Sequence, residues 1–188
     1  MSDLETPRLL LHAMTSADAE HVVAGAPAAG VRWAPGYPSP GEQGAAARFL
    51  ATCAERGDPT PFGSYEIRLR ADGVVIGGIG FHGAPDERGG VTIGYGLVES
   101  VRGQGYASEA LRALLRFARE QGVARVLGDA DAGNLASQHV MTAAGMRLVG
   151  EDASLRCYAV EWAWGGFVVG GGGEPTRGRA RGKGRRDQ

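Results

Sequence analysis

The residues with the clearest capacity for chemistry lie where a strand ends and a helix begins, between Val98 and Ala110. Gly103 and Gly105 stand in this turn, and Arg102 directly precedes them. Glycine lets a tight turn direct consecutive backbone N–H groups toward one point, and the start of the following helix adds about half a positive charge there. An arginine beside such a turn can add a bidentate contact to an anion. The segment therefore predicts a site for a pyrophosphate group.

A second glycine pattern, at residues 78–83, formally fits the G-x-G-x-x-G signature of dinucleotide-binding folds. That signature holds a pyrophosphate only where a helix opens directly after the glycines. Here Ala84, Pro85 and Asp86 follow, which predicts a turn. We therefore do not expect a dinucleotide site at this position.

The helix after the pyrophosphate turn is the most distinct element, because apolar residues recur at helical spacing from Ala107 to Ala118. A further helix is predicted to begin at Thr15 or Ser16, and residues 34–41, dense in Pro and Gly, predict a loop. The other expected helices cover residues 42–56 and 135–144, and the expected strands cover residues 6–11, 64–70, 74–81, 91–98, 123–130, 146–149 and 155–164. This order predicts an α+β fold with flanking helices and a mixed sheet, mostly antiparallel, that contains one parallel strand pair.

Composition and length favour one globular domain. The chain has 188 residues, of which 43% are hydrophobic and 22% charged, and we place the domain at residues 1–169. Residues 170–188 are rich in Gly and Arg and almost free of apolar side chains, so we expect a disordered tail there. The net charge of −1 argues against nucleic-acid binding by the chain as a whole.

Several functional classes are not expected. No apolar run reaches the length of a membrane span, and no secretory signal is visible. The two cysteines, Cys53 and Cys157, are far apart and form no ligand or disulfide pattern. We therefore expect a cytoplasmic protein without a membrane anchor or a metal site.

The pyrophosphate turn resembles a known family motif. Arg102, Gly105 and Ala107 fill the R-x-x-G-x-A pattern of the acetyl-CoA loop in the GNAT N-acetyltransferase superfamily. The opening TPRLLLHAMTSADAE and the strand IGYGL at residues 93–97 are similar to the branch that contains ribosomal-protein-alanine and ribosomal-protein-serine N-acetyltransferases. The segment Asn-Leu-Ala-Ser at residues 134–137, with Gly145 and Met146 further along the chain, is similar to the same branch. The resemblance covers most of residues 6–150 and is specific to the superfamily, not to one acceptor.

The resemblance implies an acetyl-CoA-dependent N-acetyltransferase, in which a primary amine of a small molecule or of a protein N-terminus attacks the acetyl carbonyl directly. The sheet would be splayed, with strands 91–98 and 123–130 parting to admit the pantetheine arm. The implied acetyl-CoA contacts are Leu97, Val98, Arg102, Gly103, Gln104, Gly105, Tyr106 and Ala107, together with Asn134 and Ser137. Without the resemblance, Asn134 and Ser137 would be interpreted as residues that cap a helix.

The residue that protonates the departing thiolate differs from the family pattern. Many members have a tyrosine seven residues after the asparagine, and this chain has Met141 there. Methionine cannot donate a proton, so Ser137 is the available substitute.

The proton acceptor also departs from the pattern, because Thr92 stands where the branch commonly has a glutamate. Threonine is not a base near neutral pH. We therefore consider Glu66, His82 and Asp129 as acceptors of the amine proton. Loss of that proton in solution before the amine binds is an alternative, and His82 can also be a structural residue of its strand.

Partners are less constrained than the co-substrate. The loop aromatics Trp33 and Tyr37 stand where the family places acceptor contacts, although they can also cover a small core. The acidic balance of residues 1–169 favours a cationic acceptor. We also expect a homodimer through the C-terminal strand. Two alternatives remain at this point: a catalytically idle acyl-CoA-binding regulator, and an RNA-associated factor that acts through residues 177–186.

Overall fold

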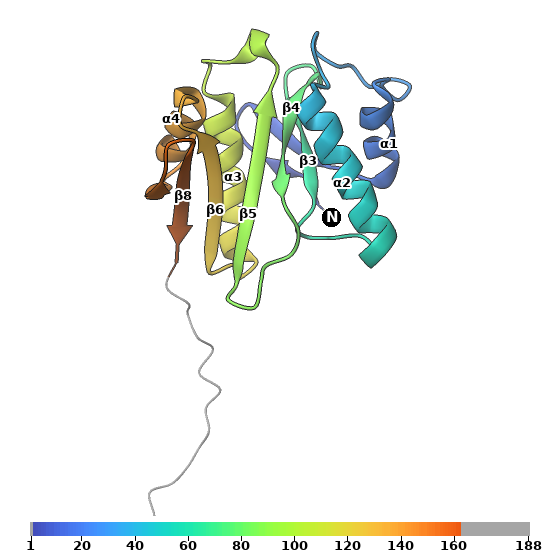
Figure 1. The fold of residues 1–188 in the computed structure, drawn as a ribbon. Helices are drawn as coiled ribbons and strands as arrows, with labels where there is room; N and C mark the ends of the chain where they lie inside the picture. The colour runs from blue at the N-terminus through green and yellow to red at the C-terminus, as the bar shows by residue number, and fades with distance from the viewer. Residues whose placement is uncertain (1, 163–188) are drawn as a thin grey trace, which may run out of the picture.

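The computed structural model describes residues 2–162, and these form one eight-stranded mixed sheet with helices on both faces (Figure 1). The strands are β1 (Leu4–Glu5), β2 (Leu9–Ala13), β3 (Ser64–Leu69), β4 (Val75–Phe81), β5 (Gly90–Leu97), β6 (Arg125–Asp131), β7 (Arg147–Glu151) and β8 (Leu155–Glu161). The helices are α1 (Ser16–Ala24), α2 (Pro40–Arg56), α3 (Tyr106–Glu120) and α4 (Leu135–Ala143), with a short 3-10 helix η1 (Glu99–Val101). The predicted α+β class is confirmed.

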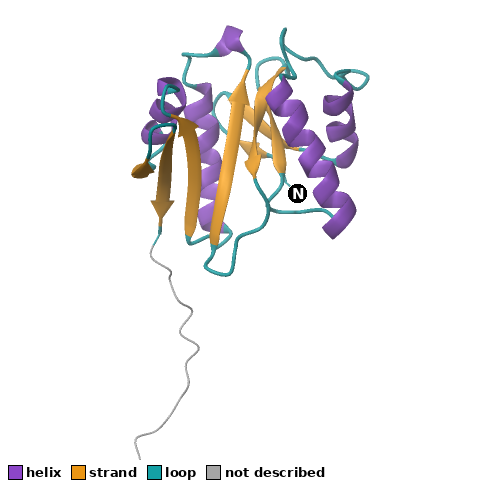
Figure 2. Ribbon diagram, viewed as in Figure 1, coloured by secondary structure: helices purple, strands orange, loops and turns teal. Residues whose placement is uncertain are grey.

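The helices form two layers around the sheet. α1 and α2 pack against each other over β3 and β4, whereas α3 and α4 lie on the opposite face (Figure 2). The apolar stripe of α3 is fully buried at Ala110, Leu111, Leu114 and Ala118, as its periodicity predicts. The helix thus anchors the pyrophosphate turn, which directly precedes it.

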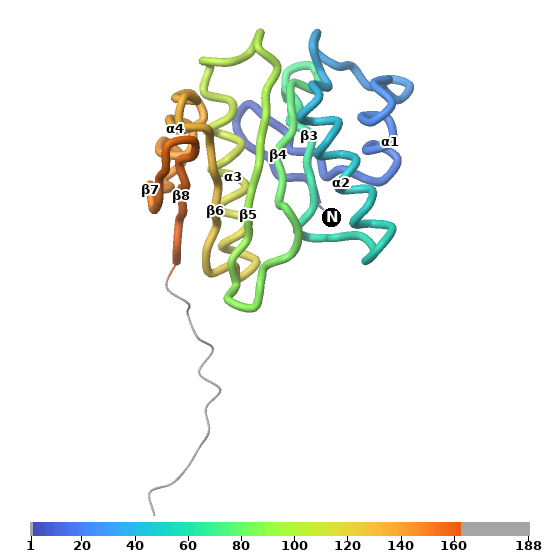
Figure 3. The backbone as a smooth tube through the Cα atoms, viewed as in Figure 1, coloured from blue at the N-terminus to red at the C-terminus, as the bar shows by residue number. Residues whose placement is uncertain are grey.

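The strands follow the order β1-β2-β3-β4-β5-β6-β8-β7, and every neighbouring pair except β5–β6 is antiparallel. β5 and β6 pair only at their beginnings, where residues 90–92 face residues 125–127. Beyond these residues the two strands separate, which Figure 3 shows as a widening gap between their tubes. The expected splay is therefore present. The far half of β5 has an open backbone edge.

The loop predicted at residues 34–41 ends earlier than expected, because α2 begins at Pro40. Ser39 caps α2, its hydroxyl accepts from the Glu42 amide, and the Glu42 carboxylate accepts from the Ser39 amide at 2.6 Å. Pro40 therefore occupies the first helical turn, where its fixed φ and missing N–H are tolerated. The dense Pro and Gly composition concealed this capping box. β1 and η1 are short and carry no periodic signal, so the sequence did not predict them.

The last described strand, β8, has no free backbone edge for the dimer that we expected to form through the C-terminal strand. β8 lies between β6 and β7, so both of its backbone edges are already paired. The edge strand on this side is β7, whose Leu148 and Val149 are exposed. The proposed disordered tail and its RNA role fall outside the described residues. Within residues 2–162, no helix combines the length and the apolar character that crossing a membrane requires.

Candidate functional site

The turn between η1 and α3 has the geometry of an anion site. Gly103 and Gly105 have φ values of +76° and +80°, a left-handed conformation that side chains with a Cβ rarely adopt. The amides of residues 103–107 donate to no acceptor among the described residues. These amides stand at the N-terminus of a 15-residue helix, which favours negative charge. The turn therefore fits the diphosphate for which the sequence predicted it.

Arg8 holds this turn in place, a role that the sequence analysis missed. Its Nε donates to Glu109 Oε2 at 2.6 Å, and its Nη1 donates to the Gln104 carbonyl at 3.0 Å. Its guanidinium lies 4.4 Å from the centre of the Tyr106 ring. The Thr6 hydroxyl also donates to Glu109, at 2.6 Å. The N-terminal T-x-R motif is thus explained as an anchor for the first turn of α3.

The open edge of β5 supplies the backbone groups next to this turn. The Val98 amide donates to the Ile76 carbonyl at 2.9 Å, so the expected contact from this amide to acetyl-CoA does not fit. Because backbone groups alternate along a strand, Tyr95 and Leu97 direct theirs into the gap toward β6. The Leu97 carbonyl accepts from Arg102 Nε at 3.0 Å. Arg102 therefore fixes the end of β5 instead of pointing freely at the turn.

Asn134 and Ser137 lie across the gap, at the start of α4. Asn134 Oδ1 accepts from the Ser137 amide at 3.0 Å, so Asn134 is a helix cap. The Ser137 hydroxyl donates to the Tyr95 hydroxyl at 3.2 Å, and the Tyr95 hydroxyl donates to the Ser137 carbonyl at 3.0 Å. Burial raises the pKa of Tyr95, and the hydrogen bond from Ser137 offsets this in part. The phenol therefore stays protonated and joins β5 to α4.

Met141 is fully buried. A Cβ added to Gly128 would lie 3.1 Å from its sulfur, which shows how closely β6 and α4 pack here. The residue therefore fills the core, and Tyr95, which the sequence analysis did not select as a functional residue, is the phenol beside Ser137.

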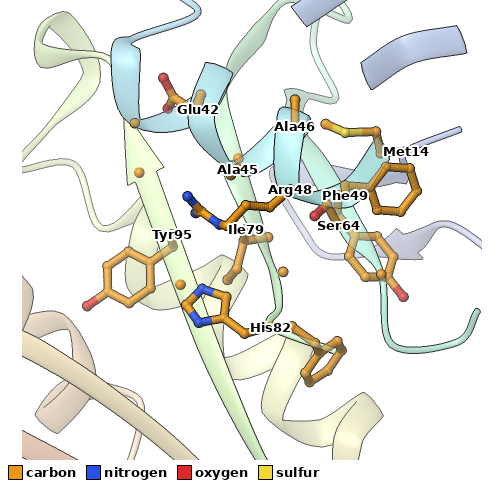
Figure 4. Close-up of a pocket in the computed structure, with 18 of the residues that line it drawn as sticks. Met14, Glu42, Ala45, Ala46, Arg48, Phe49, Ser64, Ile79, His82 and Tyr95 are labelled. Atoms are coloured by element: carbon orange, nitrogen blue, oxygen red, sulfur yellow. The ribbon is translucent and has the colours of Figure 1, made fainter. Parts of the chain in front are cut away.

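A cavity of about 460 Å³ lies on the other side of β5, between α2 and the sheet (Figure 4). Its floor consists of the backbone of Gly78, Gly80, Gly94 and Gly96 on β4 and β5. The apolar part of its wall is formed by Met14, Ala45, Ala46, Phe49, Phe62, Tyr65 and Phe81. A mostly apolar cavity of this size with few polar groups is typical of a small-molecule site.

Three ionisable side chains project over the glycine floor: Glu42, Arg48 and His82 (Figure 4). Glu42 lies directly over Gly96, because a Cβ added to Gly96 would be 3.1 Å from Glu42 Oε1. His82 lies directly over Gly94 in the same way, because an added Cβ there would be 2.7 Å from His82 Nε2. Burial lowers the pKa of His82 and the Arg48 charge lowers it further, while the Asp129 charge raises it. His82 is therefore neutral at physiological pH and can accept a proton.

The other predicted candidates occupy different places. Glu66 is only 2% exposed, is ion-paired with Arg68 at 2.6 Å, and does not line the cavity. Asp129 is exposed on β6 and acts on His82 through its charge. Tyr37 lines the cavity, but Trp33 does not; their rings pack edge to face at 5.2 Å. The structure thus brings together His82 and Tyr37 and leaves Glu66 and Trp33 outside.

Comparison with known proteins places this architecture in a family. The family model for the acetyltransferase (GNAT) domain matches residues 8–147, which include the anchored turn and the whole of β5 and α4. The chain therefore belongs to the GNAT acetyltransferase family. This confirms the resemblance found in the sequence, and it agrees with the expected enzyme class and with acetyl-CoA as co-substrate.

Individual relatives agree with this assignment. The uncharacterized N-acetyltransferase YjdG of Bacillus subtilis is 32% identical over 96 residues, which span 50% of this chain and 57% of that protein. The ribosomal-protein-S5-alanine acetyltransferase of Vibrio fischeri has the same fold, with a TM-score of 0.62 at 13% identity over 86% of this chain and 97% of that chain. The microcin C7 self-immunity acetyltransferase MccE, solved with acetyl-CoA and AMP, has a TM-score of 0.60 at 14% identity over 84% of this chain and 94% of that chain. None of these matches favours an idle regulator.

Among residues 2–162, no group of three or more potential metal ligands occurs together.

Proposed function

We propose that this chain transfers an acetyl group from acetyl-CoA to a primary amine. The observation that carries the proposal is that one strand, β5, separates two sites. Its open edge and the amides of the following turn suit the extended co-substrate, and its glycine-rich face forms the floor of a separate cavity. An amine in that cavity and a thioester in the gap would meet at β5 near Tyr95, which lines both.

Positioning would supply most of the rate enhancement. Residues 103–107 would bind the diphosphate through backbone amides, and the gap-facing groups of Tyr95 and Leu97 would align the pantetheine arm. When bound, acetyl-CoA supplies an activated acetyl group, whose C–S bond breaks as the C–N bond to the amine forms. A backbone amide of β5 that faces the gap would hold the carbonyl oxygen.

His82 is the proposed acceptor of the amine proton. It is the one of the three predicted candidates that lines the cavity, and its lowered pKa keeps it neutral. The neighbouring Asp129 carboxylate would stabilise the imidazolium that forms. The proton leaves the nitrogen as it bonds to the acetyl carbon, so the product is a neutral amide.

Ser137 and Tyr95 are the proposed source of the proton for the departing thiolate. Their hydroxyls are hydrogen-bonded at 3.2 Å and lie at the gap between β5 and α4. Because burial holds the Tyr95 pKa above its ordinary value, the pair keeps its protons at neutral pH. Together they would protonate the departing thiolate, which Met141 cannot do.

A charge placed in the diphosphate turn tests the proposal. Gly105→Asp puts a carboxylate among the amides and should abolish the stabilisation by acetyl-CoA, which at a concentration of 100 times Kd amounts to about 2.7 kcal/mol, or roughly 5–11 °C in Tm. Gly122→Asp is the matched control, because Gly122 has nearly the same φ (+79° against +80°) but follows the other end of α3. The control should retain the full shift in Tm.

Turnover is measured in parallel as release of free CoA thiol with a panel of amines, amino acids, peptides and aminoglycosides. Thiol release by the wild type that Gly105→Asp abolishes supports the proposal. Stabilisation by acetyl-CoA with no thiol release for any acceptor would instead indicate an acyl-CoA-binding regulator. Absence of any shift at millimolar acetyl-CoA would refute the proposal.

A further inference from the structure

Building on the proposed function, we infer that the acceptor is a free α-amino acid with an apolar side chain, whose carboxylate is bound by Arg48. Neither the family nor its fold assigns this acceptor. The inference depends on the arrangement of charge and apolar surface in the cavity beside β5.

Arg48 stands on the face of α2 that looks onto the glycine floor. Figure 4 shows its side chain extending from the helix toward β5, near the His82 ring. The floor beneath it is backbone only, because Gly94 and Gly96 carry no side chain. The exposed guanidinium therefore lies at the cavity wall, where a ligand from solution can reach it.

No carboxylate of the described residues neutralises this guanidinium. Arg48 takes part in none of the ion pairs formed by residues 2–162. Among the described residues, Glu42 is the one acid that lines the cavity, and its carboxylate accepts from the Ser39 amide at 2.6 Å. A planar guanidinium with free donors binds a carboxylate in a bidentate manner. The cavity therefore offers a built contact for one anionic group.

The anion and the reacting amine would share one cavity, because Arg48 and His82 both line it. Arg48 is near enough to His82 for its charge to lower the pKa of the imidazole. If His82 takes the amine proton, a carboxylate on Arg48 would lie in the same cavity as the amine nitrogen. An α-amino acid is the smallest acceptor that carries both groups, since one carbon joins its amine and its carboxylate. The carboxylate would also compensate the Arg48 charge that disfavours protonation of His82.

The rest of the cavity suits an apolar side chain. Phe49, Phe62 and Phe81 line it together with Met14 and Tyr65, which is fully buried. Phe62 and Phe81 pack edge to face at 5.3 Å, so this wall is a preformed aromatic surface. A protein N-terminus would present a neutral peptide group to Arg48 and leave the guanidinium without a partner. This local chemistry outweighs the acidic balance of residues 1–169, from which a cationic acceptor was expected.

The test compares each free amino acid with its amide. L-Phenylalanine, L-leucine and L-methionine are each assayed as the acid and as the primary amide at saturating acetyl-CoA, and thiol release is measured. The amide removes the carboxylate but keeps the amine and the side chain. The amine of the amide is less basic than the amine of the acid, so a larger fraction of it is in the reactive neutral form near neutral pH. Amine basicity alone would therefore make the amide the faster substrate. We expect kcat/KM to be at least tenfold higher for the acid of the preferred amino acid.

Arg48→Gln separates recognition of the carboxylate from general damage. The variant should raise KM for the acid at least tenfold and affect the amide much less, and so remove the preference. Arg56→Gln is the control, because Arg56 is an exposed arginine in the last turn of the same helix and does not line the cavity. It should behave as the wild type with both substrates.

Each contrary result has a distinct meaning. Equal or faster turnover of the amides, or a preference for acids that survives in Arg48→Gln, overturns the inference. Acetylation of N-terminal peptides or other amines without acetylation of the free amino acids also overturns it, but leaves the N-acetyltransferase assignment intact. Absence of both acetyl-CoA binding and thiol release refutes the proposed function as well.

Discussion

The interaction of Arg8 and Thr6 with Glu109 should couple stability to co-substrate binding, and Glu109→Gln tests it. One carboxylate receives three hydrogen bonds, from the Thr6 hydroxyl at 2.6 Å, the Arg8 amide at 2.9 Å and the Arg8 Nε at 2.6 Å. Glutamine keeps the shape and one acceptor oxygen. It loses the charge, and its NH₂ group faces a donor of Arg8.

The expected loss follows from exposure. A hydrogen bond to a charged group contributes about 1.5–3 kcal/mol when it is well buried. The Arg8 side chain is 47% exposed, so water screens its ion pair with Glu109. We therefore expect the free energy of unfolding to fall by about 1–2 kcal/mol, which lowers Tm by roughly 2–8 °C for a chain of this size.

Binding should weaken as well, because Arg8 also donates to the Gln104 carbonyl and covers the Tyr106 ring. A turn released from these contacts must be ordered again when the diphosphate binds. We expect Kd for acetyl-CoA, measured by calorimetry, to rise roughly fivefold, or about 1 kcal/mol. Glu120→Gln, the same change at the exposed far end of α3, should alter neither quantity. If Glu109→Gln melts and binds like the wild type, the reasoning is refuted.

The pH dependence gives an independent check. Partial burial raises the pKa of Glu109, but hydrogen bonds from Thr6 and Arg8 and the Arg8 charge outweigh it, so the pKa lies below 4.5. The folded pKa is thus lower than the unfolded one. The contribution of Glu109 is complete above pH 4.5 and is lost as the pH falls through the folded pKa. The difference in stability between the wild type and Glu109→Gln should therefore shrink at acidic pH.

Three further predictions concern catalysis and the cavity floor. His82→Gln should lower kcat by about 10²-fold or more, and it should abolish the rise of kcat with pH that we expect in the wild type as His82 loses its proton, at a pH below the ordinary imidazole pKa. Ser137→Ala and Tyr95→Phe should each slow thiol release, and the double variant should cost less than the sum because the hydroxyls act as a pair. Gly78→Ala should fold normally, with nearest contacts of 3.7 Å, whereas Gly80→Ala should lower Tm because its Cβ would lie 2.8 Å from the Ser64 Cα.

Local patterns were sufficient to predict most of the elements. The apolar stripe from Ala107 to Ala118 requires a buried helix, and Gly103 and Gly105 require a left-handed turn before it. The parting of β5 from β6 followed from the resemblance to the family, because no local pattern distinguishes a splayed strand pair from a closed one.

The missed residues share a physical cause. Arg8 and Glu109 are 101 positions apart, and their contact depends on the packing of β2 against α3. Glu42 and Arg48 resemble ordinary residues of a helix surface, since their place in the cavity wall arises only where α2 covers the glycine floor. The acid at Glu42 did carry a signal, because Ser39 and Glu42 have the spacing of a capping box.

The four glycines of the cavity floor have a consequence for related enzymes. Space for the acceptor exists here because side chains are missing from one sheet face, not because two elements stand apart. A methyl group gained at Gly78, Gly94 or Gly96 would enter this space or push Glu42 or His82 further into it, and so would shorten the largest acceptor that fits, while the turn before α3 would be unaffected. Acceptor size among family members should therefore vary with the number of non-glycine residues at the positions equivalent to Gly78, Gly94 and Gly96, a quantity that can be counted from sequence alone.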